Sequence, residues 1–220
     1  MSDIVITDGM IDSLRAELEE NLCAGKMSQK RFHHTVEVEK MAARLGGIYA
    51  PEKINTLRAA ALLHDLTKEY STDTQLKLCA EYGIELSEID VYAPKTLHAR
   101  TGAAVAAREY ADYVTDEVIG CIRWHTTGRA GMTLCEKLVY LADYIDMSRK
   151  FDDCVKLREY FFSPRFDGMT EEEKLCHLDD TLLLSFDMTI AGLIEKQAPI
   201  SPDTVAARNE IATANLKRKV

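Results

Sequence analysis

The chain has 220 residues, of which 46% are hydrophobic and 29% charged, and its formal net charge is −9 at pH 7. This composition is typical of a folded globular protein and excludes a disordered or fibrous chain. The acidic balance argues against a broad nucleic-acid-binding surface. It does not exclude a nucleotide ligand, because cations or metals gathered locally can still bind phosphate.

The sequence carries no signal for export or for membrane insertion. No Lys/Arg-flanked apolar segment stands at the N-terminus, and no apolar run is long enough to cross a bilayer. The cysteines are scattered without a CxxC pair, at positions 23, 79, 121, 135, 154 and 176. We therefore expect a cytoplasmic protein with free, buried thiols, forming one domain over residues 1–220, with no nucleic-acid or membrane partner. The sequence leaves the oligomeric state open, a homodimer included.

Helical periodicity recurs along the whole chain, whereas strand signals are almost absent, so we predict an all-α fold. The predicted helices occupy residues 10–22, 29–45, 51–65, 76–82, 98–107, 116–125, 134–145, 171–197 and 205–216. Residues suited to capping a helix N-terminus are Ser28, Thr115, Thr133 and Thr170. We expect the second helix to stop at Gly46 and Gly47, because glycine commonly ends helices.

The stretch over residues 59–68 is the strongest signal for a functional site in this sequence. It is an almost unbroken apolar run that ends in His64 and Asp65, with Lys68 one helical turn further on. A helix that is apolar all round lies inside a protein. A charge at the end of such a helix is costly unless it is paired or coordinates a metal. The histidine and aspartate therefore need partners from elsewhere in the chain.

Helical spacing sorts two neighbouring histidines. His34 shares a face with Val38, so we expect it to face the core, whereas His33 shares a polar face with Glu37 and faces water. His177 also has polar neighbours, and we expect it at the surface.

Other inward positions carry the same chemistry. His98 opens a helix of small residues, His125 ends a helix on its apolar face, and Asp143 lies within an apolar run. Any one of these is more often a hydrogen-bonded core residue than a ligand. Together with His34, His64 and Asp65 they suit iron, manganese, zinc, cobalt or nickel. The absence of nearby thiolates argues against a structural zinc site.

Several cations are expected near this cluster, namely Arg31, Lys68, Arg129, Lys137 and Arg149. Ordinary surface charge is the alternative, and for Lys137 and Arg149 taken alone it is the preferred one. As a group in an acidic protein they indicate an anionic ligand, and phosphate fits because guanidinium forks match its oxygens.

The order of these residues along the chain resembles that in the HD superfamily of metal-dependent phosphohydrolases. The short sequence stretches around them are similar to those of the bacterial YqeK family. The stretches that carry this resemblance are residues 31–35 (RFHHT), 60–65 (AALLHD), 97–98 (LH), 123–129 (RWHTTGR), 136–145 (EKLVYLADYI) and 202–209 (PDTVAARN). The resemblance implies an all-α HD fold, iron, and symmetrical hydrolysis of diadenosine tetraphosphate to two ADP.

The resemblance also implies roles for single residues. His34, His64, Asp65 and Asp143 would hold one metal, and Asp65 would bridge to a second, giving a dinuclear iron site in which manganese, cobalt, nickel or zinc can substitute. His98 and His125 would complete the second metal or contact phosphate. Asp65 and Lys68 would be catalytic. The residues expected to bind substrate are Arg31, Lys68, His98, His125, Thr126, Gly128, Arg129, Arg149 and Arg208.

The core of the domain is expected over about residues 29–150, with the helices of 150–220 completing the nucleotide site. Two departures from the family pattern, at residues 146–148 and 162–170, are expected to alter the substrate rim and not the metal ligands. Two alternatives stay open: another HD-type nucleotide phosphohydrolase acting on nucleoside monophosphates or deoxynucleotides, and a non-catalytic nucleotide or metal sensor.

Overall fold

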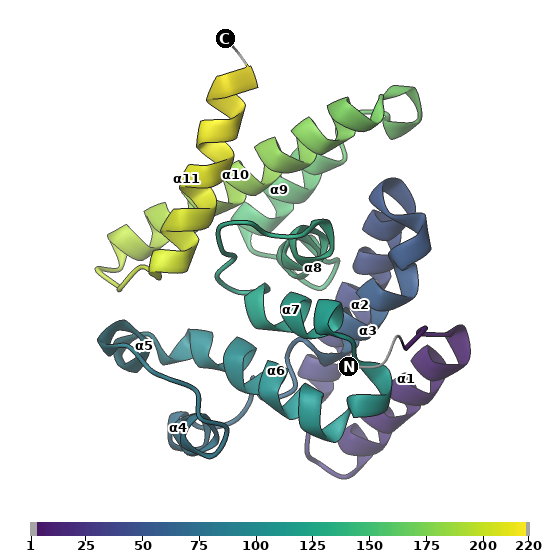
Figure 1. Ribbon diagram of the computed structural model, residues 1–220, viewed down its shortest axis with the longest axis vertical. Helices are drawn as coiled ribbons and strands as arrows, with labels where there is room; N and C mark the ends of the chain where they lie inside the picture. Colours follow the sequence, from purple (N-terminus) through teal and green to yellow (C-terminus); the bar gives the residue numbers. More distant parts are fainter. Residues whose placement is uncertain (1–3, 219–220) are drawn as a thin grey trace.

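The computed structural model describes residues 4–218, and throughout that range it contains helices and no strands, which confirms the predicted all-α class. Eleven α-helices are present in the described chain (Figure 1). They are α1 (Asp8–Cys23), α2 (Gln29–Tyr49), α3 (Ile54–Leu63), α4 (Thr72–Glu81), α5 (Glu88–Tyr92), α6 (Leu97–Glu109), α7 (Asp116–Trp124), α8 (Leu134–Ile145), α9 (Asp152–Phe161), α10 (Glu171–Glu195) and α11 (Pro202–Arg218).

Hydroxyl side chains begin most of these helices. The predicted N-caps Ser28, Thr115, Thr133 and Thr170 each accept a hydrogen bond from a backbone N–H in the first turn. A capped first turn satisfies a donor that has no partner inside the helix. Both predicted capping boxes, at Thr133 and Thr170, are present.

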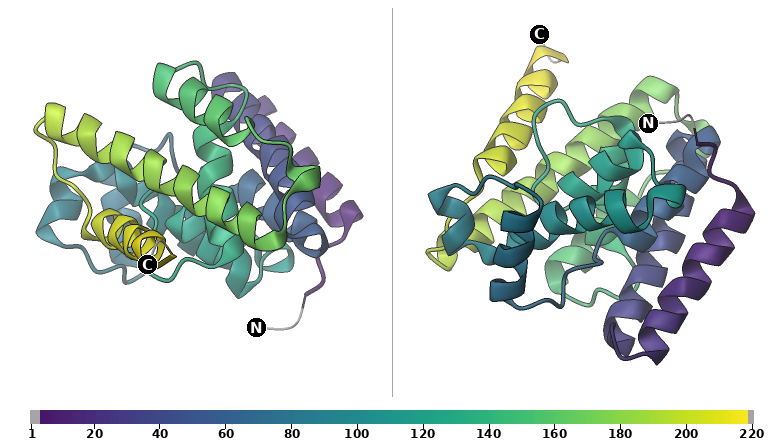
Figure 2. Two further views of the ribbon diagram at one scale, coloured as in Figure 1. Left: turned by 90° about the horizontal axis from the view of Figure 1, so that it is seen from above. Right: turned by 60° about the horizontal axis from the view of Figure 1, so that its bottom comes forward.

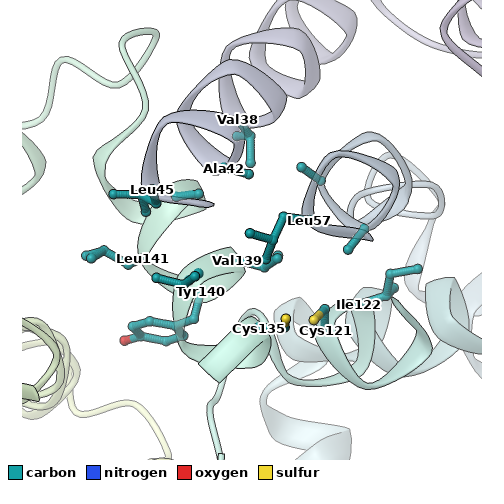
Figure 3. Packing of buried hydrophobic residues seen from close by; sticks show 14 of the residues in the cluster. Val38, Ala42, Leu45, Leu57, Cys121, Ile122, Cys135, Val139, Tyr140 and Leu141 are labelled. Atoms are coloured by element: carbon teal, nitrogen blue, oxygen red, sulfur yellow. The ribbon is translucent and has the colours of Figure 1, made fainter. Parts of the chain in front are cut away.

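The centre of the molecule is formed by α2, α3, α7 and α8, which pack against one another (Figure 1). Helix α3 is apolar almost all round, and Leu57 and residues 59–63 are fully buried. Figure 3 shows the side chains of α2, α7 and α8 meeting Leu57 in this core. Burial of the last turns of α3, residues 59–63, holds the residues that follow them, His64 and Asp65, in the interior.

The remaining helices cover this centre. Helix α1 packs on α2 and α3, and α4 packs on α6. Helix α9 packs on α8 and α10, and α11 crosses α10 at the opposite end of the molecule from α1 (Figure 2). None of the helices within residues 4–218 is long and apolar enough to span a membrane.

Some predicted boundaries are wrong. Helix α2 continues through Gly46 and Gly47 to Tyr49. Gly46 serves helix packing, because a Cβ there would lie 2.8 Å from Leu57 Cδ1. The prediction that Pro51 starts the third helix fails by one turn, since Pro51–Lys53 form a 3-10 turn before α3. Helix α11 begins at Pro202, earlier than predicted, and the short helix α5 was not predicted.

All six cysteines are free. Four of them are buried as expected, but Cys23 is exposed and Cys176 is half-buried. The expectation that His177 lies at the surface is also wrong. Its ring is half-buried and stacked on Phe161, and its Nε2 donates to the Phe161 carbonyl at 2.9 Å.

Candidate metal centre

Six predicted ligands come together although they lie on separate segments. His34 comes from α2, His64 and Asp65 from the turn after α3, and His98 from α6. His125 follows α7, and Asp143 comes from α8. His33 is exposed whereas His34 is buried, so the helical sorting of the two neighbouring histidines is confirmed.

Three of the four imidazoles are held by the same tether. In each, Nδ1 lies within hydrogen-bond distance of the carbonyl three residues earlier in the chain. A carbonyl only accepts, so Nδ1 carries the hydrogen and the Nε2 lone pair is left for the centre of the cluster. The distances are 2.6 Å for His64 to Ala61 O, 2.8 Å for His98 to Lys95 O and 2.7 Å for His125 to Ile122 O.

The fourth imidazole has a different support. His34 Nδ1 lies 3.3 Å from Asp146 Oδ2 and 3.1 Å from Ser148 Oγ, and its Nε2 lies 3.0 Å from Asp143 Oδ1. Burial lowers the pKa of His34, but the hydrogen bonds to Asp143 and Asp146 outweigh burial and raise it to about 9. These carboxylates therefore favour a positive charge at the ring, and a bound metal can supply it in place of a proton.

Asp65 is shared between two groups of imidazoles. Its Oδ2 lies 3.2 Å from His64 Nε2 and 3.7 Å from His34 Nε2. Its Oδ1 lies 3.2 Å from His98 Nε2 and 3.6 Å from His125 Nε2. Burial raises the pKa of this carboxyl, yet the charge of His64 and the hydrogen bonds from the imidazoles hold it well below its usual range. Asp65 is thus a carboxylate placed between two sets of nitrogen ligands.

Three buried atoms at this point have close polar neighbours but, within the described chain, no hydrogen bond of good geometry. They are His34 Nε2, His64 Nε2 and Asp65 Oδ1. In addition, the Nε2 atoms of His98 and His125 lie only 3.0 Å apart, and burial lowers the pKa of His98 to about 4, so its ring is neutral at pH 7. Facing lone pairs and unpaired carboxylate oxygens suit a cation, and the residues fit a divalent metal. Two groups whose ligand atoms all lie within 4.8 Å are His34, His64 and Asp143, and His64, Asp65 and His125.

Cations surround the cluster. Arg31 pairs with Asp65, and Arg149 pairs with Asp143. Lys68 Nζ lies 3.0 Å from His98 Nε2 and 4.0 Å from Asp65 Oδ1. Burial lowers the pKa of Lys68, against the opposing charge of Asp65. The three side chains therefore place positive charge directly beside the candidate ligands.

Two hollows open next to the cluster. The first, of about 490 Å³, is the cationic hollow; within the described residues no carboxylate lines it, and its lining is Lys30, Arg31, His33, His34, Lys68, Ser148, Arg149, Lys150 and Phe151. The second, of about 460 Å³, is the aromatic hollow, and its lining is Lys68, His125, Thr126, Tyr140, Asp143, Tyr144, Arg149, Phe151, Asp153, Cys154, Thr189 and Lys196. The candidate ligands His34, His125 and Asp143 thus border space open to solvent.

The other predicted binding residues divide into two sets. Thr126 lies in the cluster, with its Oγ1 3.0 Å from His125 Nε2. Arg129 instead binds the buried Glu136, and Arg208 pairs with Asp187 on the surface. Neither arginine lines a hollow, so the prediction that they contact the nucleotide is not supported by their positions.

Gly128 also differs from its predicted role. Its φ is +64°, and a Cβ there would lie 2.7 Å from the ring of Phe186. The close approach that requires glycine is therefore to a buried aromatic ring and not to either hollow.

Sequence reasoning missed three residues near the centre. Asp146 and Ser148 contact His34, so the departure from the family pattern at residues 146–148 reaches a candidate ligand and not only the rim. An acid one turn after Asp143 was the available signal. Phe151 borders both hollows, and nothing in its spacing identified it.

The helices and the histidine–aspartate cluster define a metal-binding domain of the HD type. Residues 31–148 match the model of the HD domain, and this span contains all six candidate ligands. The chain belongs to the HD-domain family.

Similar proteins within the family carry a specific name. A protein of Halalkalibacterium halodurans named "Bis(5'-nucleosyl)-tetraphosphatase, symmetrical" is 32% identical over 84% of this chain and 90% of its own length. A Bacillus subtilis protein of the same name is 30% identical over 90% of this chain and 98% of its own length. A crystal structure from Clostridium acetobutylicum, described as a predicted HD superfamily hydrolase involved in NAD metabolism, superposes with a TM-score of 0.77 at 32% identity. It covers 92% of this chain and 97% of that one.

Proposed function

We propose that this protein is a metal-dependent hydrolase that cleaves diadenosine tetraphosphate symmetrically into two ADP. The observation that carries the proposal is the cluster of imidazoles and carboxylates beside a hollow lined by cations and, among the described residues, by no acid. Such a hollow in a chain of net charge −9 favours a polyphosphate. The shared name of the two bacterial relatives supports this particular substrate.

The metal is proposed to be iron, in a dinuclear site, with manganese, cobalt, nickel or zinc as substitutes. The two oxygens of Asp65 support the dinuclear arrangement, because each faces a different group of imidazoles. His34, His64 and Asp143 would hold the first ion with Asp65, and His98 and His125 the second. A bound divalent metal lowers the pKa of coordinated water toward neutrality and withdraws charge from phosphoryl oxygens.

The side chains of the hollows bind and orient the substrate. Arg31 and Arg149 present guanidinium groups to the tetraphosphate, and Lys68, which lines both hollows, meets the central phosphates. The Lys68 ammonium then offsets negative charge on the departing ADP. Thr126 holds its hydroxyl against the Nε2 atoms of His98 and His125 and fixes that edge of the site.

The helices after residue 150 complete the nucleotide site. Asp153 and Cys154 of α9 and Thr189 of α10 line the aromatic hollow together with residues of α8. We place the protein in the cytoplasm, because free cysteines suit a reducing compartment.

The test is a product analysis. Purified protein is incubated with diadenosine tetraphosphate, with and without a chelator, and the products are separated by anion exchange. ADP as the only product, lost with the chelator, is the expected result. Equimolar AMP and ATP would show that the phosphates bind in another register. Hydrolysis of a nucleoside monophosphate or deoxynucleotide alone would indicate a different HD-type phosphohydrolase, and metal binding without any turnover would indicate a sensor.

A further inference from the structure

One aromatic side chain borders both hollows beside the candidate metal centre. Phe151 lines both the cationic and the aromatic hollow, and it lies two residues after Arg149, which is paired with Asp143. Its position relative to the candidate ligands is therefore fixed by a short piece of backbone. Lys68 and Arg149 line both hollows too, so cationic groups and an aromatic ring border the same space.

Phe151 is not held there by the hydrophobic core. It is 72% exposed, the highest value among the exposed aromatic residues of the described chain. Exposed apolar area is unfavourable unless something covers it. A single exposed side chain is ordinary, so exposure alone does not assign a role.

The position of Phe151 in its helix adds an independent observation. The N-cap residues of α1, α2, α4, α5, α7, α8 and α10 are serines or threonines that accept a backbone hydrogen bond. Phe151, the N-cap of α9, makes no such bond, and neither do Lys53 at α3 and Thr96 at α6; of these three, only Phe151 is apolar. Phenylalanine here forgoes both a capping bond and burial. A residue that breaks a local rule without a structural gain is expected at a functional site.

The chemistry of the aromatic hollow completes the argument. Tyr140 and Tyr144 line it together with Phe151, and their ring centroids are 6.5 Å apart. Asp143, itself a candidate metal ligand, and Lys68 also line it. A nucleoside diphosphate has a complementary arrangement: its phosphates match the charged side chains of the hollow, and its flat base matches the aromatic side chains. Aromatic rings stack on any base, since every base offers a π-face.

We propose that Phe151 stacks on the nucleobase of one half of the substrate and determines the affinity for nucleosides over bare polyphosphates. This inference rests on the proposed function, because it takes the phosphate end of the site as given. Stacking does not distinguish adenine from guanine. Phe151 therefore recognises a base as such and contributes to binding, while Lys68 and the metal ligands act at phosphorus.

The experiment measures binding separately from turnover. Metal-loaded wild-type protein and the variants Phe151→Ala, Phe151→Trp and Tyr92→Ala are titrated calorimetrically with ADP, with GDP and with inorganic pyrophosphate, in buffer that holds the metal in excess. Tyr92 is 70% exposed and lines neither hollow, so it is a matched exposed-aromatic control. KM and kcat for diadenosine tetraphosphate are then measured for each protein.

We expect Phe151→Ala to lower the affinity for ADP and for GDP by about 10-fold, because one stacking contact with the base is lost. Pyrophosphate should bind as to the wild type, Phe151→Trp should restore nucleotide affinity, and Tyr92→Ala should change nothing. KM should rise with kcat nearly unchanged.

Three results would overturn the inference. The first is equal affinity of wild type and Phe151→Ala for ADP. The second is an equal loss for ADP and pyrophosphate, which would mean damage to the phosphate end. The third is a wild-type protein that binds ADP no better than pyrophosphate. If the Phe151-dependent preference for ADP is present but diadenosine tetraphosphate is not cleaved, the inference stands and the proposed function fails.

Discussion

Replacing Gly128 by alanine tests how closely the loop after α7 packs on the C-terminal helices. The glycine follows His125 and Thr126 in the same loop, and its N–H donates to Trp124 O at 2.9 Å. Its φ is +64°, and a Cβ would lie 2.7 Å from Phe186 Cζ and 3.2 Å from Met132 Sδ. Phe186 is fully buried, so its ring has no free space into which it can move.

Two costs add at this position. A left-handed backbone conformation costs an alanine about 1–2 kcal/mol, and forcing an extra methyl group into a packed core costs about 1–3 kcal/mol. The expected loss for Gly128→Ala is therefore about 2–5 kcal/mol. Gly83 separates the two costs, because its φ is also +64° but nothing lies within 4 Å of its Cβ position. Gly83→Ala should show only the backbone cost, and the entropy that any glycine-to-alanine change removes from the unfolded chain cancels between the two variants.

The assay is urea unfolding of both variants and the wild type, followed by far-ultraviolet circular dichroism. Gly128→Ala should unfold at a clearly lower urea concentration than Gly83→Ala, by the equivalent of about 1–3 kcal/mol. Identical midpoints would refute the reasoning, because they would show that Phe186 and Met132 yield without cost.

Two further predictions concern the metal centre. His34→Ala should strip most of the metal found by elemental analysis of protein purified without chelator, whereas His33→Ala should keep it, because only His34 faces the carboxylates; equal losses would show that the two histidines are assigned to the wrong faces. Lys68→Ala should lower turnover of diadenosine tetraphosphate by about a hundredfold with near-normal metal content, since one positioned charge at a phosphoryl centre is lost. The control is Lys40→Ala, which removes a lysine side chain that is 64% exposed and lines neither hollow, and it should leave turnover unchanged. An inactive Lys40 variant or a fully active Lys68 variant would contradict the role assigned to Lys68.

The sequence by itself indicated the all-α class, most of the helices and the candidate ligands. Apolar periodicity placed His34 inward and His33 outward, and the apolar run before His64 and Asp65 located the centre. These signals are local. Because an α-helix has 3.6 residues per turn, residues three or four positions from a buried residue lie on the same buried face. The apolar run around Asp143 added this carboxylate to the same cluster, and the matched domain over residues 31–148 confirms the family.

Only the tertiary structure decided what surrounds those ligands. Asp146 lies behind His34 although 112 positions separate them in the chain (146 − 34), and Phe151 borders both hollows because α9 packs on α8 and α10. Arg129 pairs with Glu136 and Arg208 with Asp187. The sequence shows that these arginines are positively charged, but only the fold shows which carboxylate lies close enough to bind each guanidinium. Contacts between distant segments depend on how whole helices pack. The hydrophobic periodicity of one helix indicates which of its faces is buried, but not which other helix covers that face.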